Sequence, residues 1–142
     1  ELFINPDVRM YLGGTISTYE AVSKLNKWIE ANDSLYLSVR IKNSGEFAGI
    51  IDISPYDNYI KKELSYQFLP SVWGMGYAYE AIYSVIEYYS NVLDIKYLVS
   101  ETQTENLKSC RFLNKLGFKL SDIINRFGAE QSLYVLNLNE MR

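Results

Sequence analysis

A glycine turn between a strand-like and a helix-like segment constrains the fold of this chain most strongly. Residues 71–81 read SVWGMGYAYEA, with Gly74 and Gly76 one residue apart. The segment before it, ELSYQFL at 63–69, reads as a strand, and the segment after it, from about Tyr77 to Asn91, carries apolar side chains at helical spacing. The first N–H groups of a helix are unpaired, so a strand that enters a helix through this turn predicts an anion site.

The other segments predict one mixed α/β domain over residues 1–142. A hairpin around KNSGE comes first, and a single β-α-β crossover through the glycine turn follows, so the predicted sheet is mixed and mostly antiparallel. The predicted elements are a helix tail ending at Gly13-Gly14, a helix over 18–32 with Thr18 as N-cap, strands over 34–41, 47–54 and 61–69, a helix from about 77 to 91, a strand over 95–102, a helix within 106–118 that stops at Gly117, and a closing strand over 131–139 with one more strand optional at the end.

The residue types that are missing limit the chemistry. The chain has no histidine and one cysteine, Cys110, which excludes imidazole catalysis, histidine metal sites, internal disulfides and thiolate zinc sites. A general base must then be a carboxylate, a polarised water or a backbone group. The net charge of −3 argues against a nucleic-acid partner. Without a membrane-length apolar run or a signal-peptide pattern, the sequence predicts a cytoplasmic protein with no membrane partner and no metal.

Two common phosphate-binding motifs do not fit the glycine turn. A Walker loop needs a lysine and a hydroxyl residue after its second glycine, and the turn supplies neither. A dinucleotide fingerprint needs a third small residue where this chain has Tyr79. A bare G-x-G can also join a strand to a helix without binding anything, so the turn alone leaves both interpretations open.

A second motif decides between them. Tyr66 and Pro70 near the end of the strand, WGMGYAYEA at 73–81 and NLKSCRFLNKLGF at 106–118 follow one another at a set separation. On these residues the chain, from Glu63 to Phe118, resembles the GNAT superfamily of acyl-CoA-dependent N-acetyltransferases. More narrowly, it resembles the branch that acetylates the N-termini of ribosomal proteins. The resemblance implies the GNAT fold and the transfer of an acetyl group from acetyl-CoA to a primary amine, by direct attack in a ternary complex.

The resemblance also identifies the anion as the pyrophosphate of coenzyme A. It implies that the strand before the turn parts from the next strand, that the pantetheine arm lies between them, and that a backbone N–H near Leu69 to Ser71 stabilises the oxyanion. Pro70, which has no N–H, is where the ladder pairing is expected to stop. Ser71 departs from the superfamily pattern, which has Gln or Arg there. The residues implied to bind the coenzyme are Phe68, Leu69, Ser71, Trp73, Gly74, Met75, Gly76, Tyr77, Ala78, Asn106, Ser109 and Arg111.

The main catalytic candidates each have a structural alternative. Glu101 is the first choice as general base, and otherwise a solvated carboxylate at a strand end. Ser109 is the first choice as proton donor to the leaving thiolate, and otherwise a serine of a first helical turn. Asn106 is either a coenzyme contact or an N-cap, or both. Arg111 either reaches coenzyme phosphates or lies on the surface. Leu113 stands where the superfamily has its thiolate-protonating tyrosine.

Further candidates rank lower. Glu63 and Glu130 are alternative bases, and Tyr134 is an alternative acid. Glu80 is more simply an acidic residue favoured by the start of a helix, and Cys110 is an inert small residue rather than a nucleophile.

Other functions and the acceptor stay open at this point. The same fold also serves as a non-catalytic acyl-CoA-binding module, or as a partner-binding domain that has lost the coenzyme. The acceptor is a protein N-terminus, a polyamine, an amino sugar or an antibiotic amine, and the segment 54–62 with Tyr56 and Tyr59 is expected to line its pocket. The resemblance implies a first strand and a complete first helix that this chain lacks, which leaves a sheet edge compatible with a homodimer.

Overall fold

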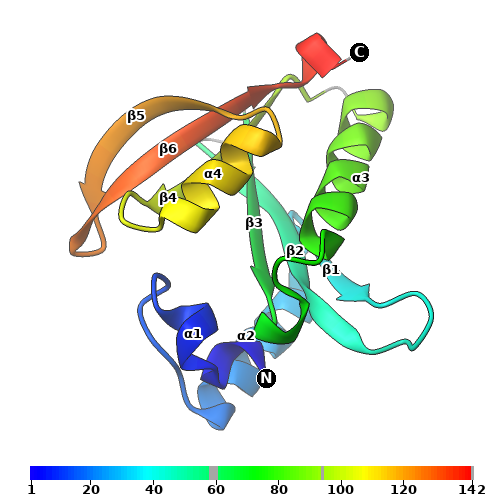
Figure 1. Ribbon diagram of the computed structural model, residues 1–142, viewed down its shortest axis with the longest axis vertical. Coiled ribbons are helices and arrows are strands. Elements are labelled where there is room, and N and C mark those ends of the chain that lie inside the picture. The colour runs from blue at the N-terminus through cyan, green and yellow to red at the C-terminus, as the bar shows by residue number, and fades with distance from the viewer. Residues whose placement is uncertain (58–60, 94, 142) are drawn as a thin grey trace.

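The computed structural model describes residues 1–57, 61–93 and 95–141. Within these ranges, no helix is both long enough and apolar enough to cross a bilayer. The elements are the 3-10 helices η1 (Leu2–Ile4), η2 (Pro70–Val72) and η3 (Leu138–Met141), the α-helices α1 (Pro6–Arg9), α2 (Thr18–Glu30), α3 (Tyr77–Val92) and α4 (Leu107–Lys115), and the strands β1 (Leu35–Arg40), β2 (Phe47–Tyr56), β3 (Lys61–Phe68), β4 (Tyr97–Gln103), β5 (Lys119–Arg126) and β6 (Ala129–Asn137) (Figure 1).

The six strands form one sheet in the order β1-β2-β3-β4-β6-β5 (Figure 1). Every neighbouring pair is antiparallel except β3 and β4, which α3 connects as a parallel crossover. The predicted mixed, mostly antiparallel sheet with a single β-α-β unit is confirmed.

Side-chain alternation divides the sheet into two faces. On one face, Leu64 of β3 and Leu98 of β4 join a core with Ile82 of α3 and Leu113 of α4, and all four are fully buried. Burial of each such side chain contributes about 1.5–3 kcal/mol. On the other face α2 lies against β1, where Trp28 stacks on Tyr36 with ring centroids 4.6 Å apart. The helices therefore cover the sheet from both sides.

The sheet opens between its two parallel strands. Among the described residues, β3 and β4 pair only at Lys62 with Leu98 and at Glu63 with Val99. The Ser100 hydroxyl donates to the Leu64 carbonyl at 2.9 Å, just beyond the last paired position. β3 then continues to Phe68 alongside β2 alone. The predicted parting of the two strands is present, but the pairing with β4 ends long before Pro70, so the predicted end point was wrong.

Three local predictions were wrong. Helix α1 ends at Arg9 instead of running to Gly13-Gly14, because the Arg9 guanidinium donates to the Leu12 and Gly14 carbonyls and holds the chain in a turn. Ser17, not Thr18, is the N-cap of α2, since it forms a capping box with Glu20. The optional last strand precedes the closing strand, as β5, rather than following it.

Candidate active site

The glycine turn holds its two glycines in the left-handed region. Gly74 has φ 72° and Gly76 has φ 84°, a backbone conformation that other residues seldom adopt. A Cβ atom on either glycine would meet nothing within 4 Å, so the constraint is conformational and the space beside the turn is open. Gly76 is the N-cap of α3 and no side chain caps this helix. The N–H groups of the first turn of α3, including that of Ala78, are available to an external anion.

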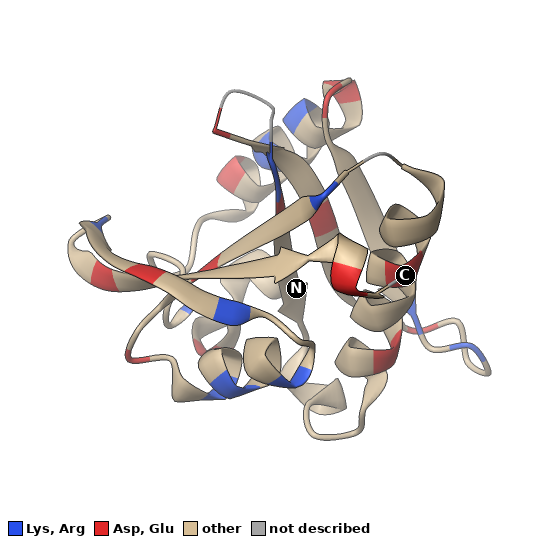
Figure 2. Ribbon diagram, turned by 90° about the horizontal axis from the view of Figure 1, so that it is seen from above, with Lys and Arg blue, Asp and Glu red and all other residues tan. Residues whose placement is uncertain are grey.

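Helix α4 contributes positive charge beside this turn. The Lys108 ammonium lies 5.7 Å from the ring centroid of Trp73, and that of Lys115 lies 4.8 Å from the ring centroid of Tyr79. The Trp73 indole also donates to the Phe68 carbonyl at 2.9 Å, which ties the turn to the end of β3. Arg111 shares the exposed face of α4 with the two lysines, because residues three, four and seven apart lie on one side of a helix (Figure 2).

The other predicted coenzyme residues of the turn are exposed side chains. Ser71, Met75 and Tyr77 all present surface next to the start of α3. With its open glycines, uncapped helix and basic neighbours, the turn has the donor chemistry that a pyrophosphate requires.

The backbone along β3 offers fewer free donors than expected at Leu69. The Leu69 N–H donates to the Ala48 carbonyl at 2.9 Å, and Pro70 has no N–H. Because backbone groups alternate in direction along a strand, the N–H groups of Tyr66 and Phe68 point away from β2 and toward the opening to β4. The backbone therefore favours Phe68 over Leu69 as a donor to a ligand in that opening.

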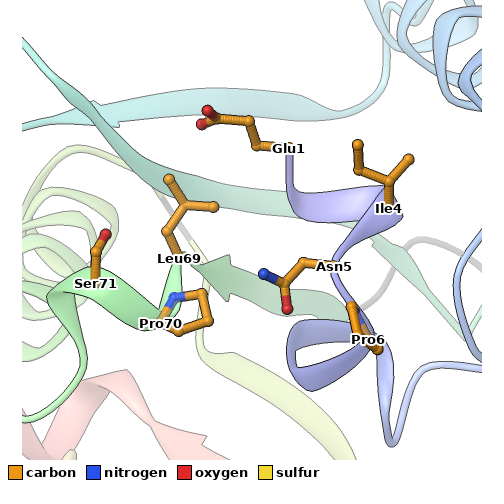
Figure 3. A pocket seen from close by; sticks show the side chains of 7 residues that line it. All are labelled: Glu1, Ile4, Asn5, Pro6, Leu69, Pro70 and Ser71. Carbon is orange, nitrogen blue, oxygen red and sulfur yellow. The ribbon is translucent and has the colours of Figure 1, made fainter.

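A hollow of about 540 Å³ adjoins the end of β3 (Figure 3). The chain from Leu69 to Ser71 forms one wall, and Glu1, Ile4, Asn5 and Pro6 of the N-terminal segment form the other (Figure 3). It is large enough for a small molecule and lies directly beside three of the predicted coenzyme residues.

The start of α4 brings a hydroxyl pair to the opening between β3 and β4. Asn106 is the N-cap of α4, and its side-chain oxygen accepts the Ser109 N–H at 3.2 Å, which confirms the structural alternative for this asparagine. The Ser109 hydroxyl lies 2.8 Å from the hydroxyl of Tyr66. Sequence reasoning used Tyr66 only as a motif residue and missed this contact, which joins residues far apart in the chain. Leu113 is fully buried in the core.

Tyr134 is buried beside Cys110 rather than exposed in the opening. Burial, followed by the hydrogen bond with Cys110, raises the pKa of Tyr134 to about 12. The Cys110 thiol itself lies 3.9 Å from the Thr104 carbonyl.

Glu101 lies on the opposite face of the sheet from Ser109 and is almost fully buried. Its side chain is 6% exposed, and one carboxylate oxygen lies 3.4 Å from the guanidinium of Arg126 on β5. Neither oxygen has a hydrogen-bond partner among the described residues. The solvated alternative for Glu101 was therefore wrong. A buried carboxylate with an ion pair but no hydrogen bond is costly, which makes it receptive to a cationic donor.

Two more carboxylates share this face with Glu101. Glu63 pairs with Val99, two residues before Glu101, and Asp52 lies diagonally beside Glu63 on β2. Burial, then the charge of Glu101, then that of Asp52 raise the pKa of Glu63, and Arg126 opposes the rise. Burial raises the pKa of Asp52 to about 6, opposed by Lys24. We call Asp52, Glu63 and Glu101 the carboxylate row.

The remaining candidates lie apart from this row or at its edge. Glu130 lies in β6, one residue before Gln131, and alternation turns it to the face opposite Glu101. Glu80 is exposed in the first turn of α3. Tyr56 lies near the row, since burial and then the charge of Glu101 raise the pKa of its phenol. Tyr59 lies outside the described residues.

Several known proteins are similar to this chain. Residues 1–119 match the family described as acetyltransferase (GNAT) domain. "Uncharacterized protein YkkB" of Bacillus subtilis is 30% identical over 139 residues, which cover 94% of this chain and 80% of that protein. "Uncharacterized N-acetyltransferase p20" of Bacillus licheniformis is 24% identical over 131 residues, which cover 87% of this chain and 72% of that protein.

Solved structures share the fold. A GNAT-family acetyltransferase from Bacillus anthracis superposes with a TM-score of 0.85 at 20% identity, covering 97% of this chain and 86% of that one. Spermidine N-acetyltransferase from Vibrio cholerae, solved with CoA and spermine, superposes with a TM-score of 0.81 at 17% identity, with the same coverage. The ribosomal-protein branch is not singled out among these relatives. The match over residues 1–119 shows that this chain is an enzyme of the GNAT acetyltransferase family.

Proposed function

We propose that this enzyme transfers the acetyl group of acetyl-CoA to a primary amine by direct attack within a ternary complex. The observation that carries the proposal is the opening between β3 and β4, which begins directly beyond Glu63 and Val99. On the α4 side, the opening meets the uncapped start of α3 and the Ser109 hydroxyl. On the other side it meets the buried carboxylate of Glu101. A thioester in this opening is thus accessible to an amine from the opposite face of the sheet.

The coenzyme residues are proposed in three groups. The turn from Trp73 to Ala78 holds the pyrophosphate through its N–H groups. The backbone of Phe68 pairs with the pantetheine arm, and Asn106 and Ser109 contact the arm and the sulfur. Lys108 and Arg111 neutralise phosphate charge from α4.

The transfer step joins the amine nitrogen to the thioester carbonyl carbon and breaks the carbon–sulfur bond. A free alkylamine has a pKa of about 10, so it arrives protonated and must lose a proton before it attacks. Glu101 accepts that proton, directly or through water, and a backbone N–H of Phe68 or Ser71 donates to the oxyanion. The electron pair of the broken bond leaves on sulfur beside Ser109.

The acceptor is proposed to be an amine that is cationic in solution. The carboxylate row carries three acidic groups, while Lys24 and Arg126 supply two positive charges at its ends, so the row favours a bound cation. The likeness to a spermidine acetyltransferase makes a polyamine the first acceptor to assay, with an N-terminal peptide and an amino sugar beside it. A cytoplasmic location suits all three acceptors, and homodimerisation is tested by light scattering.

Calorimetric titration with acetyl-CoA tests the coenzyme site. Wild type is expected to bind with micromolar affinity and the Gly76→Trp variant is expected not to bind, because a bulky residue at φ 84° distorts the turn and covers its N–H groups. Gly45→Trp is the matched control, since Gly45 has φ 74° and equally open space in a distant loop. Binding without turnover on any amine would instead favour a non-catalytic acyl-CoA-binding module. Equal affinities for all three proteins would rule out the turn as the coenzyme site.

A further inference from the structure

Tyr66 and Ser109 form a hydroxyl pair across the opening of the sheet. Tyr66 lies in β3, three residues past the last pairing with β4, and Ser109 lies in the first turn of α4. Their oxygens are 2.8 Å apart. The Tyr66 ring packs edge-on against Phe112 of the same helix, with centroids 5.3 Å apart. Both members are therefore held in place by the packing of α4 on β3.

The direction of the hydrogen bond follows from the chemistry of the two groups. Two hydroxyls bring two hydrogens, and one bond between them uses one, so the other hydrogen can bond elsewhere. Burial raises the pKa of Tyr66 to about 12, although the bond with Ser109 opposes the rise, so the phenol keeps its proton at any working pH. A phenol is also the more acidic hydroxyl and hence the better donor. The favoured arrangement has Tyr66 donating to Ser109, which leaves the Ser109 hydrogen free.

We propose that Tyr66 is a positioning residue that aims the Ser109 hydroxyl at the sulfur of the departing coenzyme. The proposal rests on the proposed acetyl transfer. When the carbon–sulfur bond breaks, its electron pair stays on sulfur, and the Ser109 O–H donates a hydrogen bond to that thiolate. A thiol has a pKa of about 8.5, so the thiolate needs a hydrogen bond while it forms and takes its proton from solvent after release. No proton has to leave the serine, and none passes through Tyr66.

Ser109 is well suited to this because its other polar groups are engaged. Its backbone N–H is accepted by Asn106 at 3.2 Å, and its oxygen is engaged by Tyr66. Loss of the phenol hydroxyl would let the serine hydroxyl rotate or turn toward the helix backbone, as serines in helices commonly do. The pair should therefore act as one unit in turnover.

A double-mutant cycle on kcat tests the pair. Tyr66→Phe removes one oxygen and keeps the ring that packs on Phe112, and Ser109→Ala removes the other. We expect each to lower kcat about tenfold at saturating acetyl-CoA, with the KM for acetyl-CoA within about twofold of wild type. The double variant should be no slower than Ser109→Ala, because without Ser109 there is nothing for Tyr66 to position. Turnover is followed as thiol release with spermidine, an alanine-initiated peptide and glucosamine.

Two controls separate a positioning role from a structural one. Tyr83→Phe removes a phenol hydroxyl from a tyrosine that stacks on Tyr79, away from the opening, and should keep full kcat. Thermal unfolding of Tyr66→Phe should stay close to wild type. A wild-type kcat for Tyr66→Phe, or losses that multiply to about a hundredfold in the double variant, would overturn the proposal while leaving acetyl transfer intact. An absence of turnover by wild type on every amine would overturn the proposed function and this role together.

Discussion

Glu101 is the residue whose surroundings bear most directly on catalysis. Its carboxylate is buried with one ion pair and no hydrogen bond. We expect Glu101→Gln, which keeps the shape but cannot accept the proton, to lower kcat by about 10² to 10⁴ while the affinity for acetyl-CoA stays unchanged. Steady-state rates and calorimetry measure the two quantities. Glu130→Gln is the matched control, because Glu130 faces the other side of the sheet; equal rates in both variants would remove Glu101 from the mechanism.

Asp52 offers a test of the same face through stability. Burial raises its pKa from 3.8 to about 6, so the folded protein binds this proton more tightly than the unfolded chain does. Its contribution to stability is thus present below pH 4 and is lost as the pH rises through about 6. We expect Asp52→Asn to raise the free energy of unfolding at pH 7.5 by up to about 3 kcal/mol, and by far less at pH 4.

Urea unfolding at the two pH values measures this difference. Asp7→Asn, at an exposed position in α1, should show no such dependence on pH. The same gain for Asp52→Asn at pH 4 and pH 7.5 would show that the effect does not come from titration of this carboxyl.

Among the elements, α4 is expected to contribute binding energy through its charge. Lys108 and Arg111 lie on the face that borders the glycine turn, where the coenzyme phosphates are proposed to bind. We expect Lys108→Gln to weaken acetyl-CoA binding about three- to tenfold at low salt, and by less at 0.5 M salt because exposed charges are screened. Calorimetry at two salt concentrations measures it. Lys42→Gln, in the loop after β1, is the control, and identical affinities for the two variants would contradict a role for α4.

Local sequence patterns predicted most of the elements, for identifiable physical reasons. The β1–β2 hairpin, the glycine turn and α3 each depend on neighbours in the chain, so their residues were sufficient to predict them. Strand β5 has almost wholly exposed side chains and so lacks the alternation by which a half-buried strand is recognised. Its place in the sheet is set by pairing with β6, which local patterning does not show.

The candidate site divides in the same way. Asn106 as a cap and the left-handed glycines follow from local residue types. The Glu101–Arg126 ion pair and the Tyr66–Ser109 contact join elements that meet only through the order of the strands. That order was not predictable from the residues involved, and this is why the solvated interpretation of Glu101 was wrong and Tyr66 was missed.

At the scale of the whole molecule, the sheet separates the two proposed substrates and lets them meet only at the opening between β3 and β4. Ser109 borders this opening on one face and Glu101 on the other, so both substrates should have to be bound before transfer occurs. We expect initial-rate plots with varied acetyl-CoA and amine to intersect rather than run parallel. Cys110→Ala should keep at least half of the wild-type kcat, because this thiol packs against the Thr104 carbonyl and Tyr134 rather than serving as an acyl carrier. Parallel plots, or an acetylated enzyme trapped with acetyl-CoA in the absence of an amine, would instead require a covalent intermediate and would contradict direct attack across the sheet.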